Sequence, residues 1–148
     1  MLKVENLSVR YGAVTAVKDV SLEVSEGEMV CLLGANGSGK TTTMLAIAGA
    51  LKASGRVTFN GEDITSLSPE RVLRKGIAMV PETREVFSDL TVRENLILGG
   101  FIHRRNRKKS QHDTEQMLDL FPVLRERQNQ QSGTLSGGEQ QRLAIARA

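Results

Sequence analysis

The spacing of apolar residues changes along the chain, and each spacing predicts a different element. Val20, Leu22 and Val24 alternate with polar residues, as in a strand with one buried face. The continuous apolar run 29–33 (MVCLL) predicts a fully buried strand, and Cys31 inside it is expected to be a buried thiol. Residues 56–61 predict a shorter strand followed by a turn.

Apolar residues at intervals of three and four predict helices elsewhere, over 44–51 and over 117–124. A short helix is expected over 69–75. Another begins after Thr91, because Thr91 and Glu94 have the spacing of a capping box. We expect core packing for the apolar face of the last segment, formed by Met117, Leu120, Phe121 and Leu124.

The segment 34–41 (GANGSGKT) fits the phosphate-binding loop pattern G-x-x-x-x-G-K-[ST] without a gap. It lies between the predicted strand 29–33 and the predicted helix 44–51, which is the context that this loop requires. Its glycines reach backbone angles that side chains forbid, so consecutive N–H groups can point into one concavity. The following helix adds positive charge at its N-terminus. The alternative is a solvated glycine-rich turn, which the flanking elements disfavour.

In this pattern the lysine, Lys40, reaches the β- and γ-phosphates of a nucleoside triphosphate, and the hydroxyl of Thr41 ligates Mg²⁺. Thr42 is expected to add a hydroxyl contact nearby. The candidate nucleotide-binding residues of the loop are Gly34, Asn36, Gly37, Ser38, Gly39, Lys40, Thr41 and Thr42.

A second motif, LSGGEQQR, occupies residues 135–142. Ser136 is a plausible N-cap, and Glu139 follows three residues later as in a capping box. A helix N-terminus presented in this way suits a phosphate group. An ordinary capped helix is the alternative, and the local pattern alone leaves both open.

Together the two motifs closely resemble the ATP-binding cassette (ABC) family, whose signature is L-S-G-G-x-Q. The resemblance implies an α/β fold: a P-loop NTPase core with an N-terminal antiparallel β-subdomain and an α-helical subdomain. It implies ATP and Mg²⁺ as cofactors. Tyr11 matches the aromatic residue that stacks on adenine, although it could simply end a strand, and Val17 matches an apolar residue near the base.

The resemblance also implies partners. In such proteins two subunits form a head-to-tail dimer, so Ser136, Gly137 and Gly138 would contact the γ-phosphate bound by a second ABC ATPase subunit. We expect 1–148 to be a partial ABC ATP-binding domain. Its parts are 1–80, the β-subdomain and P-loop core; 81–135, the Q-loop and helical subdomain; and 136–148, the signature and the start of the following helix.

Residues 77–82 look like a buried strand that ends in the family's Q-loop, with Glu82 where most members carry glutamine. A carboxylate could also ligate Mg²⁺, so Thr41 and Glu82 are the candidate metal ligands, and Lys40 and Glu82 the candidate catalytic residues. The glutamate is characteristic of ATPases in branched-chain amino acid uptake. The stretches that resemble this branch are 80–82 (VPE), Phe87, 90–96 (LTVRENL), 120–124 (LFPVL) and 133–141 (GTLSGGEQQ).

Other family features are not found before Ala148: the strand ending in Asp-Glu, the D-loop and the switch histidine. Both histidines, His103 and His112, precede the signature. We therefore expect the C-terminal part of the core to be missing, the chain to be a fragment, and hydrolysis by it to be weak or absent. Without the missing strand, the predicted strand at residues 30–33 would lack a neighbour on one side and leave an apolar edge uncovered.

Composition adds limits on partners and location. The net charge of +3 and the aromatic content of 3% give no nucleic-acid platform. The basic segment 104–109 (RRNRKK) predicts a solvated loop, or a contact with lipid headgroups or acidic loops of a membrane subunit. No apolar stretch approaches ~20 residues and no signal peptide is evident. We expect a cytoplasmic protein that reaches the inner face of the plasma membrane through transmembrane permease subunits.

Three functions follow. The first is an ATP-binding subunit that couples ATP binding and hydrolysis to import, with branched-chain amino acids as the expected substrate. The second is a truncated, non-catalytic nucleotide-binding or interaction module. The third is a non-transport ABC ATPase that acts on ribosomes or DNA.

Overall fold

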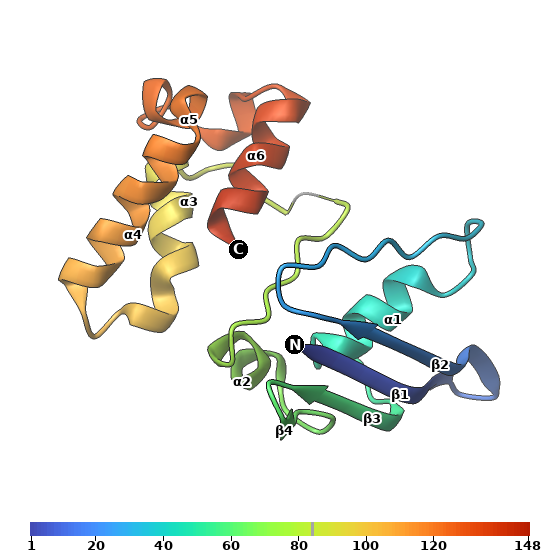
Figure 1. Ribbon diagram of the computed structural model, residues 1–148. Coiled ribbons are helices and arrows are strands. Elements are labelled where there is room, and N and C mark those ends of the chain that lie inside the picture. The colour runs from blue at the N-terminus through green and yellow to red at the C-terminus, as the bar shows by residue number, and fades with distance from the viewer. Residues whose placement is uncertain (84) are drawn as a thin grey trace. The chain divides into compact units, whose positions relative to one another are not determined.

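The computed structural model describes residues 1–83 and 85–148. The chain consists of two compact units, Met1–Met79 and Val80–Ala148 (Figure 1). Each unit has its own hydrophobic core. Local sequence signals account for parts of each unit: turn residues connect strands in the first, and capping residues start helices in the second.

Unit 1 contains a four-stranded antiparallel sheet in the order β2-β1-β3-β4. The strands are β1 (Leu2–Tyr11), β2 (Val14–Val24), β3 (Ser54–Phe59) and β4 (Glu62–Asp63). A two-residue turn joins β3 to β4 through Asn60 and Gly61, both with positive φ, which is the preferred chemistry of a tight hairpin. The antiparallel subdomain expected from the resemblance is therefore present.

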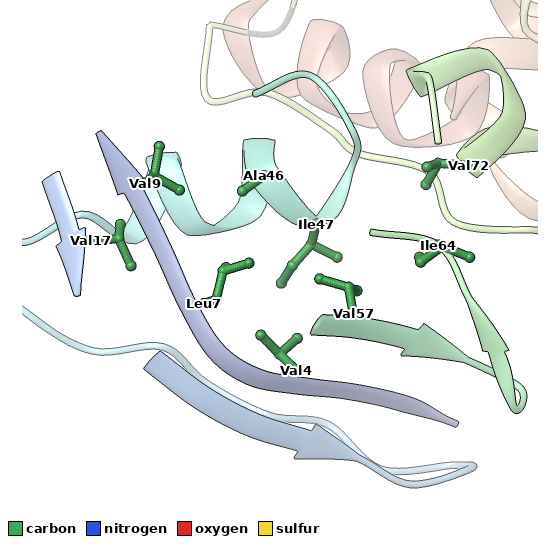
Figure 2. Close-up of a cluster of buried hydrophobic side chains, with 9 residues drawn as sticks. All are labelled: Val4, Leu7, Val9, Val17, Ala46, Ile47, Val57, Ile64 and Val72. Atoms are coloured by element: carbon green, nitrogen blue, oxygen red, sulfur yellow. The ribbon is translucent and has the colours of Figure 1, made fainter. Parts of the chain in front are cut away.

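Two helices belong to this unit, α1 (Lys40–Ile47) and α2 (Pro69–Arg74). Figure 2 shows apolar side chains of β1, β2 and β3 meeting Ala46 and Ile47 of α1 between the helix and the sheet. The predicted alternation in β2 is confirmed, because Val20, Leu22 and Val24 are half-buried between exposed polar residues, and Val20 and Leu22 pack against this core.

The helix predicted over 44–51 is shorter than expected. It ends at Ile47, because Gly49 has a φ of 75° and the N–H of Ala50 donates to the carbonyl of Leu45 at 2.9 Å. These are the marks of a Schellman motif, which stops a helix. Leu51 therefore lies beyond the helix, but it still packs against the core of unit 1.

Two strand predictions were wrong. Residues 29–33 and 77–82 form no strand, and Met29 and Leu33 are 90% and 87% exposed. Cys31 is exposed as well, so the prediction of a buried thiol was also wrong. A strand is stabilised by a partner ladder, and no described residue pairs with either segment. An apolar run alone does not supply that partner.

Unit 2 is helical, with α3 and α6 packed side by side and α4 against α3 (Figure 1). Its elements are α3 (Val92–Gly99), η1 (Gly100–His103), α4 (Arg107–Leu120), α5 (Pro122–Glu126), η2 (Ser132–Thr134) and α6 (Gly137–Arg147). The core gathers apolar side chains from α3, α4, α5 and α6, including Val92, Leu118, Leu124 and Leu143.

Both predicted capping boxes are confirmed, at Thr91 with Glu94 and at Ser136 with Glu139. The predicted face over 117–124 is only partly correct. Pro122 starts a new helix, because proline cannot continue the preceding one, and the helical phase shifts there. Leu118 and Leu124 are therefore the buried residues, whereas Leu120 is 66% exposed.

Candidate functional site

The loop 34–39 runs directly into α1, whose first residue is Lys40. Gly37 and Gly39 have φ angles of 84° and 90°, which side chains rarely adopt. The Ser38 N–H donates to the carbonyl of Ala35 at 3.2 Å, which closes a turn at the tip of the loop. The backbone of the predicted loop therefore adopts angles at positions 37 and 39 that favour glycine.

The Lys40 ammonium lies across the beginning of the loop. Its Nζ donates to the carbonyl oxygens of Gly34 and Ala35 at 2.8 and 2.9 Å. An ammonium has three N–H donors, so one remains for another acceptor. The lysine is thus placed by backbone contacts rather than left as a free surface charge.

The N-terminus of α1 is uncapped, unlike those of α3 and α6. Gly39 is its N-cap and offers no side-chain acceptor, and the first turn carries no acidic residue. The first N–H groups of a helix have no partner within the helix and carry partial positive charge. An anion fits this position both by hydrogen bonding and by charge.

Strand β2 supports the loop from behind. A Cβ at Gly39 would lie 2.8 Å from the carbonyl oxygen of Ala16 and 3.0 Å from Cγ2 of Val17. Val17 is a buried core residue beside this glycine, and Tyr11 stands half-exposed at the end of β1. The close backbone approach therefore requires glycine at position 39.

The three threonines at the start of α1 differ in burial. Thr41 is exposed and Thr42 is half-buried, whereas Thr43 is buried and its Oγ1 donates to the carbonyl of Gly39 at 2.9 Å. The contact of Thr43 was not predicted. Its only sequence signal is a hydroxyl four residues after the glycine, where a side chain can return to the backbone.

The signature segment belongs to unit 2 and begins α6. The Ser136 N–H donates to Oε2 of Glu139 at 2.8 Å, and the Glu139 N–H donates to Ser136 Oγ at 3.4 Å. Hydrogen bonds to the carboxylate from the hydroxyl and the N–H of Ser136, with a further contribution from Arg127 at 3.0 Å, hold the pKa of Glu139 below its usual range. In the part of the chain that the structure describes, Gly137 and Gly138 find no side-chain acceptor for their N–H groups.

Glu82, the other candidate metal ligand, is exposed in a turn of unit 2. Within the described ranges 1–83 and 85–148 there is no cluster of three histidine, cysteine or acidic side chains that could hold a metal ion by itself. A magnesium ion in this protein would therefore need oxygen ligands from a bound phosphate or from water.

Comparison with known sequences assigns the family. The profile of the ABC transporter family matches residues 17–148. The chain belongs to the ABC transporter family. Among related proteins, the high-affinity branched-chain amino acid transport ATP-binding protein BraG of Pseudomonas aeruginosa is 48% identical, across all of this chain and 63% of its own length. A probable branched-chain amino acid transport ATP-binding protein, LivF of Archaeoglobus fulgidus, is 40% identical across all of this chain and 62% of its own length.

Solved structures place the fold in the same family. A nucleotide-free ATP-binding cassette from an ABC transporter superposes on 99% of the chain with a TM-score of 0.83 and 31% identity, and the match covers 63% of that cassette. The dimeric cassette MJ0796, bound to ADP and Pi, superposes on 99% with a TM-score of 0.84 and 28% identity, and the match covers 68% of it. The predicted α/β cassette fold is confirmed.

The chain thus spans just under two thirds of the length of the related transport proteins. Among the described helices, none combines the length and the apolar character needed to cross a bilayer.

Proposed function

We propose that this chain binds ATP through the loop 34–39 and the start of α1, as part of the ATP-binding subunit of an ABC transporter. The observation that supports this most directly is the uncapped N-terminus of α1 beside the positioned ammonium of Lys40. Both features are suited to phosphate oxygens. Tyr11 and Val17 are proposed as the contacts of the adenine base.

Magnesium is proposed to accompany the nucleotide, with the Thr41 hydroxyl and the Glu82 carboxylate as protein ligands. Mg²⁺ keeps several waters and takes one or two protein oxygens together with substrate phosphates, so an exposed hydroxyl and one carboxylate are a sufficient set. When bound, the ion would neutralise charge on the β- and γ-phosphates. Lys40 would hold the same phosphates by its remaining N–H donor.

The signature is proposed to act on a second subunit. Ser136 and Glu139 cap each other, so the free N–H groups at this helix start are those of Gly137 and Gly138. Two adjacent N–H groups and a serine hydroxyl would suit a γ-phosphate presented by the partner of a head-to-tail dimer. The capping box would keep these groups in place before the dimer forms.

The transported substrate is proposed to be a branched-chain amino acid, and the direction import. Two relatives that the chain matches along its entire length have names that specify branched-chain amino acid transport, and the direction follows from the resemblance to uptake systems. Residues 1–80 would form the β-subdomain and P-loop core, 81–135 the Q-loop and helical subdomain, and 136–148 the signature segment. The subunit would lie on the cytoplasmic side of the membrane, bound to permease subunits.

Nucleotide binding tests the first proposal. The probe is a fluorescent ATP analogue, titrated into the complete product of the gene that encodes this chain. Lys40→Ala is expected to weaken binding at least about tenfold, because a charge-assisted hydrogen bond is lost. Lys52→Ala removes an exposed lysine outside the loop and is the matched control. Equal affinities for the Lys40→Ala variant and the unchanged protein would refute the proposed site.

Cellular uptake tests the transport assignment separately. Deletion of the gene is expected to reduce leucine uptake, and the unchanged gene, but not Lys40→Ala, should restore it. Nucleotide binding without any effect on uptake would favour the non-catalytic module. Co-sedimentation with ribosomes in place of membranes would favour the non-transport ATPase.

A further inference from the structure

A pocket of about 310 Å³ lies in unit 2, on the side where α3, η1 and the start of α4 meet. Such a volume is at the lower end of ligand-binding sites and holds roughly ten waters. The residues that give the pocket its chemical character are Arg93, Ile97, Leu98, Phe101, Arg104 and Arg107. None of them belongs to the proposed nucleotide site.

The three arginines differ in how far their charge is satisfied. Arg93 is paired with Glu115 at 2.7 Å and also donates to Gln128 at 2.8 Å. Arg104 covers the ring of Phe101, with 4.7 Å from the guanidinium carbon to the ring centroid. Arg107 forms no ion pair with any described acid.

No acidic residue is found among the described residues that line the pocket. The lining also includes the hydroxyl and amide groups of Ser110, Gln111 and Thr114, which are neutral hydrogen-bonding groups. Glu115 balances the charge of Arg93, so the positive charge at this pocket that has no described ion-pair partner is that of Arg104 and Arg107.

The apolar wall of the pocket is unusually exposed. Ile97, Leu98 and Phe101 keep between 41% and 57% of their surface in contact with solvent. Apolar groups that stay exposed next to one another mark ligand or partner sites, because covering them with an apolar group is favourable.

We propose that this pocket binds a small carboxylate that carries an apolar group and no ammonium. The planar guanidinium of Arg107 matches a carboxylate in a bidentate arrangement, and Ile97, Leu98 and Phe101 cover the apolar part. An ammonium on the ligand would have no carboxylate partner in the pocket, so a zwitterion binds more weakly than the simple acid. The site is independent of nucleotide binding.

Calorimetric titration of the complete gene product tests the ligand class with four matched probes. 4-Methylpentanoate carries both the charge and the apolar body. 4-Methylpentan-1-ol lacks the charge, acetate lacks the apolar body, and leucine adds an ammonium to the same skeleton. Saturable binding is expected for 4-methylpentanoate, with the other three at least about tenfold weaker.

Paired variants tie the binding to the pocket. Arg107→Gln is expected to weaken 4-methylpentanoate binding at least about tenfold, whereas Arg105→Gln, an exposed arginine outside the lining, should leave it unchanged. Ile97→Ser should weaken it about threefold to tenfold. Its control is Ile145→Ser, because Ile97 and Ile145 are 47% and 50% exposed and only Ile97 lines the pocket.

Three outcomes would overturn the inference. One is the absence of saturable 4-methylpentanoate binding at millimolar concentration. Another is equal loss in Arg105→Gln and Arg107→Gln, which would mean that segment 104–109 attracts anions as a diffuse charge. The third is equal affinity for acetate and 4-methylpentanoate, which would remove the role of the apolar wall. ATP affinity, measured in parallel, should not change in any of these variants.

Discussion

The side-chain amide of Asn95 in α3 donates to Ser132 Oγ in η2 at 3.2 Å, and both side chains are fully buried. Ser132 Oγ in turn donates to the carbonyl of Phe87 at 2.7 Å, and the Phe87 N–H donates to Asn95 Oδ1 at 3.0 Å. The three residues close a ring of hydrogen bonds. The ring joins the segment after Glu82 to the segment before the signature.

Replacing Asn95 by leucine should destabilise unit 2 by about 2–3 kcal/mol, because the part-buried Phe87 N–H loses its acceptor and the buried Ser132 Oγ loses the N–H that it accepts. Urea unfolding of the complete gene product, followed by circular dichroism, measures the change. Ser132→Ala should cost about 1 kcal/mol, and the double variant should cost less than the sum, because the two residues share one network. Strict additivity would contradict a coupled ring.

Gly99 allows α3 and α6 to approach closely. A Cβ at this position would lie 2.1 Å from the carbonyl oxygen of Arg147. Alanine is favoured over glycine in helices by up to about 1 kcal/mol, but a backbone clash at this distance must separate the helices. We therefore expect Gly99→Ala to lower the stability of unit 2 by about 1–3 kcal/mol.

The control for this substitution is Gly138→Ala in α6, where the nearest atom to a new Cβ is Nη1 of Arg142 at 3.9 Å. This change should leave the unfolding midpoint almost unaltered, within about 0.5 kcal/mol. If Gly99→Ala were equally neutral, the close packing of α3 on α6 would be wrong. Gly138→Ala can then be used to test the signature without concern for folding.

Two glycines of the phosphate-binding loop separate backbone strain from steric clash. Gly37 and Gly39 both have positive φ, but of the two only Gly39 has neighbours among the described residues, namely Ala16 and Val17, where a Cβ would stand. Gly37→Ala should cost about 1 kcal/mol from the backbone alone, and Gly39→Ala about 2 kcal/mol or more. Thermal unfolding without nucleotide measures both. The same cost for each would mean that β2 does not constrain the loop.

Local signals in the sequence were sufficient for much of this fold. The capping boxes at Thr91 and Ser136 were predicted correctly, because a cap depends on residues three positions apart. The alternation in 20–24 was also correct, since β1 lies next to it in both sequence and space. The loop 34–39 was located by a pattern in which each residue type has a physical reason.

What the sequence did not predict depends on distant partners. Residues 29–33 have the composition of a buried strand, but a strand needs a neighbour that local composition does not specify. The burial of Asn95 was not predicted, because a polar residue in a helix usually faces water. Arg107 was assigned only to a basic segment. The pocket depends on the fold, because Arg107 at the start of α4 lines the same cavity as Ile97 and Phe101.

The capping box at the signature should make stability depend on pH in the acidic range. Hydrogen bonds from Ser136, and then the charge of Arg127, lower the pKa of Glu139 in the folded state. A folded-state pKa below the unfolded one contributes stability that is present above the ordinary glutamate range and is lost as pH falls through the lower, folded value. Hydrogen bonds from the N–H and the hydroxyl of Thr91 lower the pKa of Glu94 in the same way.

Glu139→Gln isolates this contribution, because glutamine can fill the same capping position but does not titrate. We expect the variant to unfold at a similar urea midpoint to the unchanged protein at low pH, and at a lower midpoint at neutral pH. Glu94→Gln should behave in the same way, and the double variant should have the flattest pH profile. An unchanged pH dependence in Glu139→Gln would show that the carboxylate of Glu139 is not stabilised by folding, and the capping geometry at Ser136 would have to be revised.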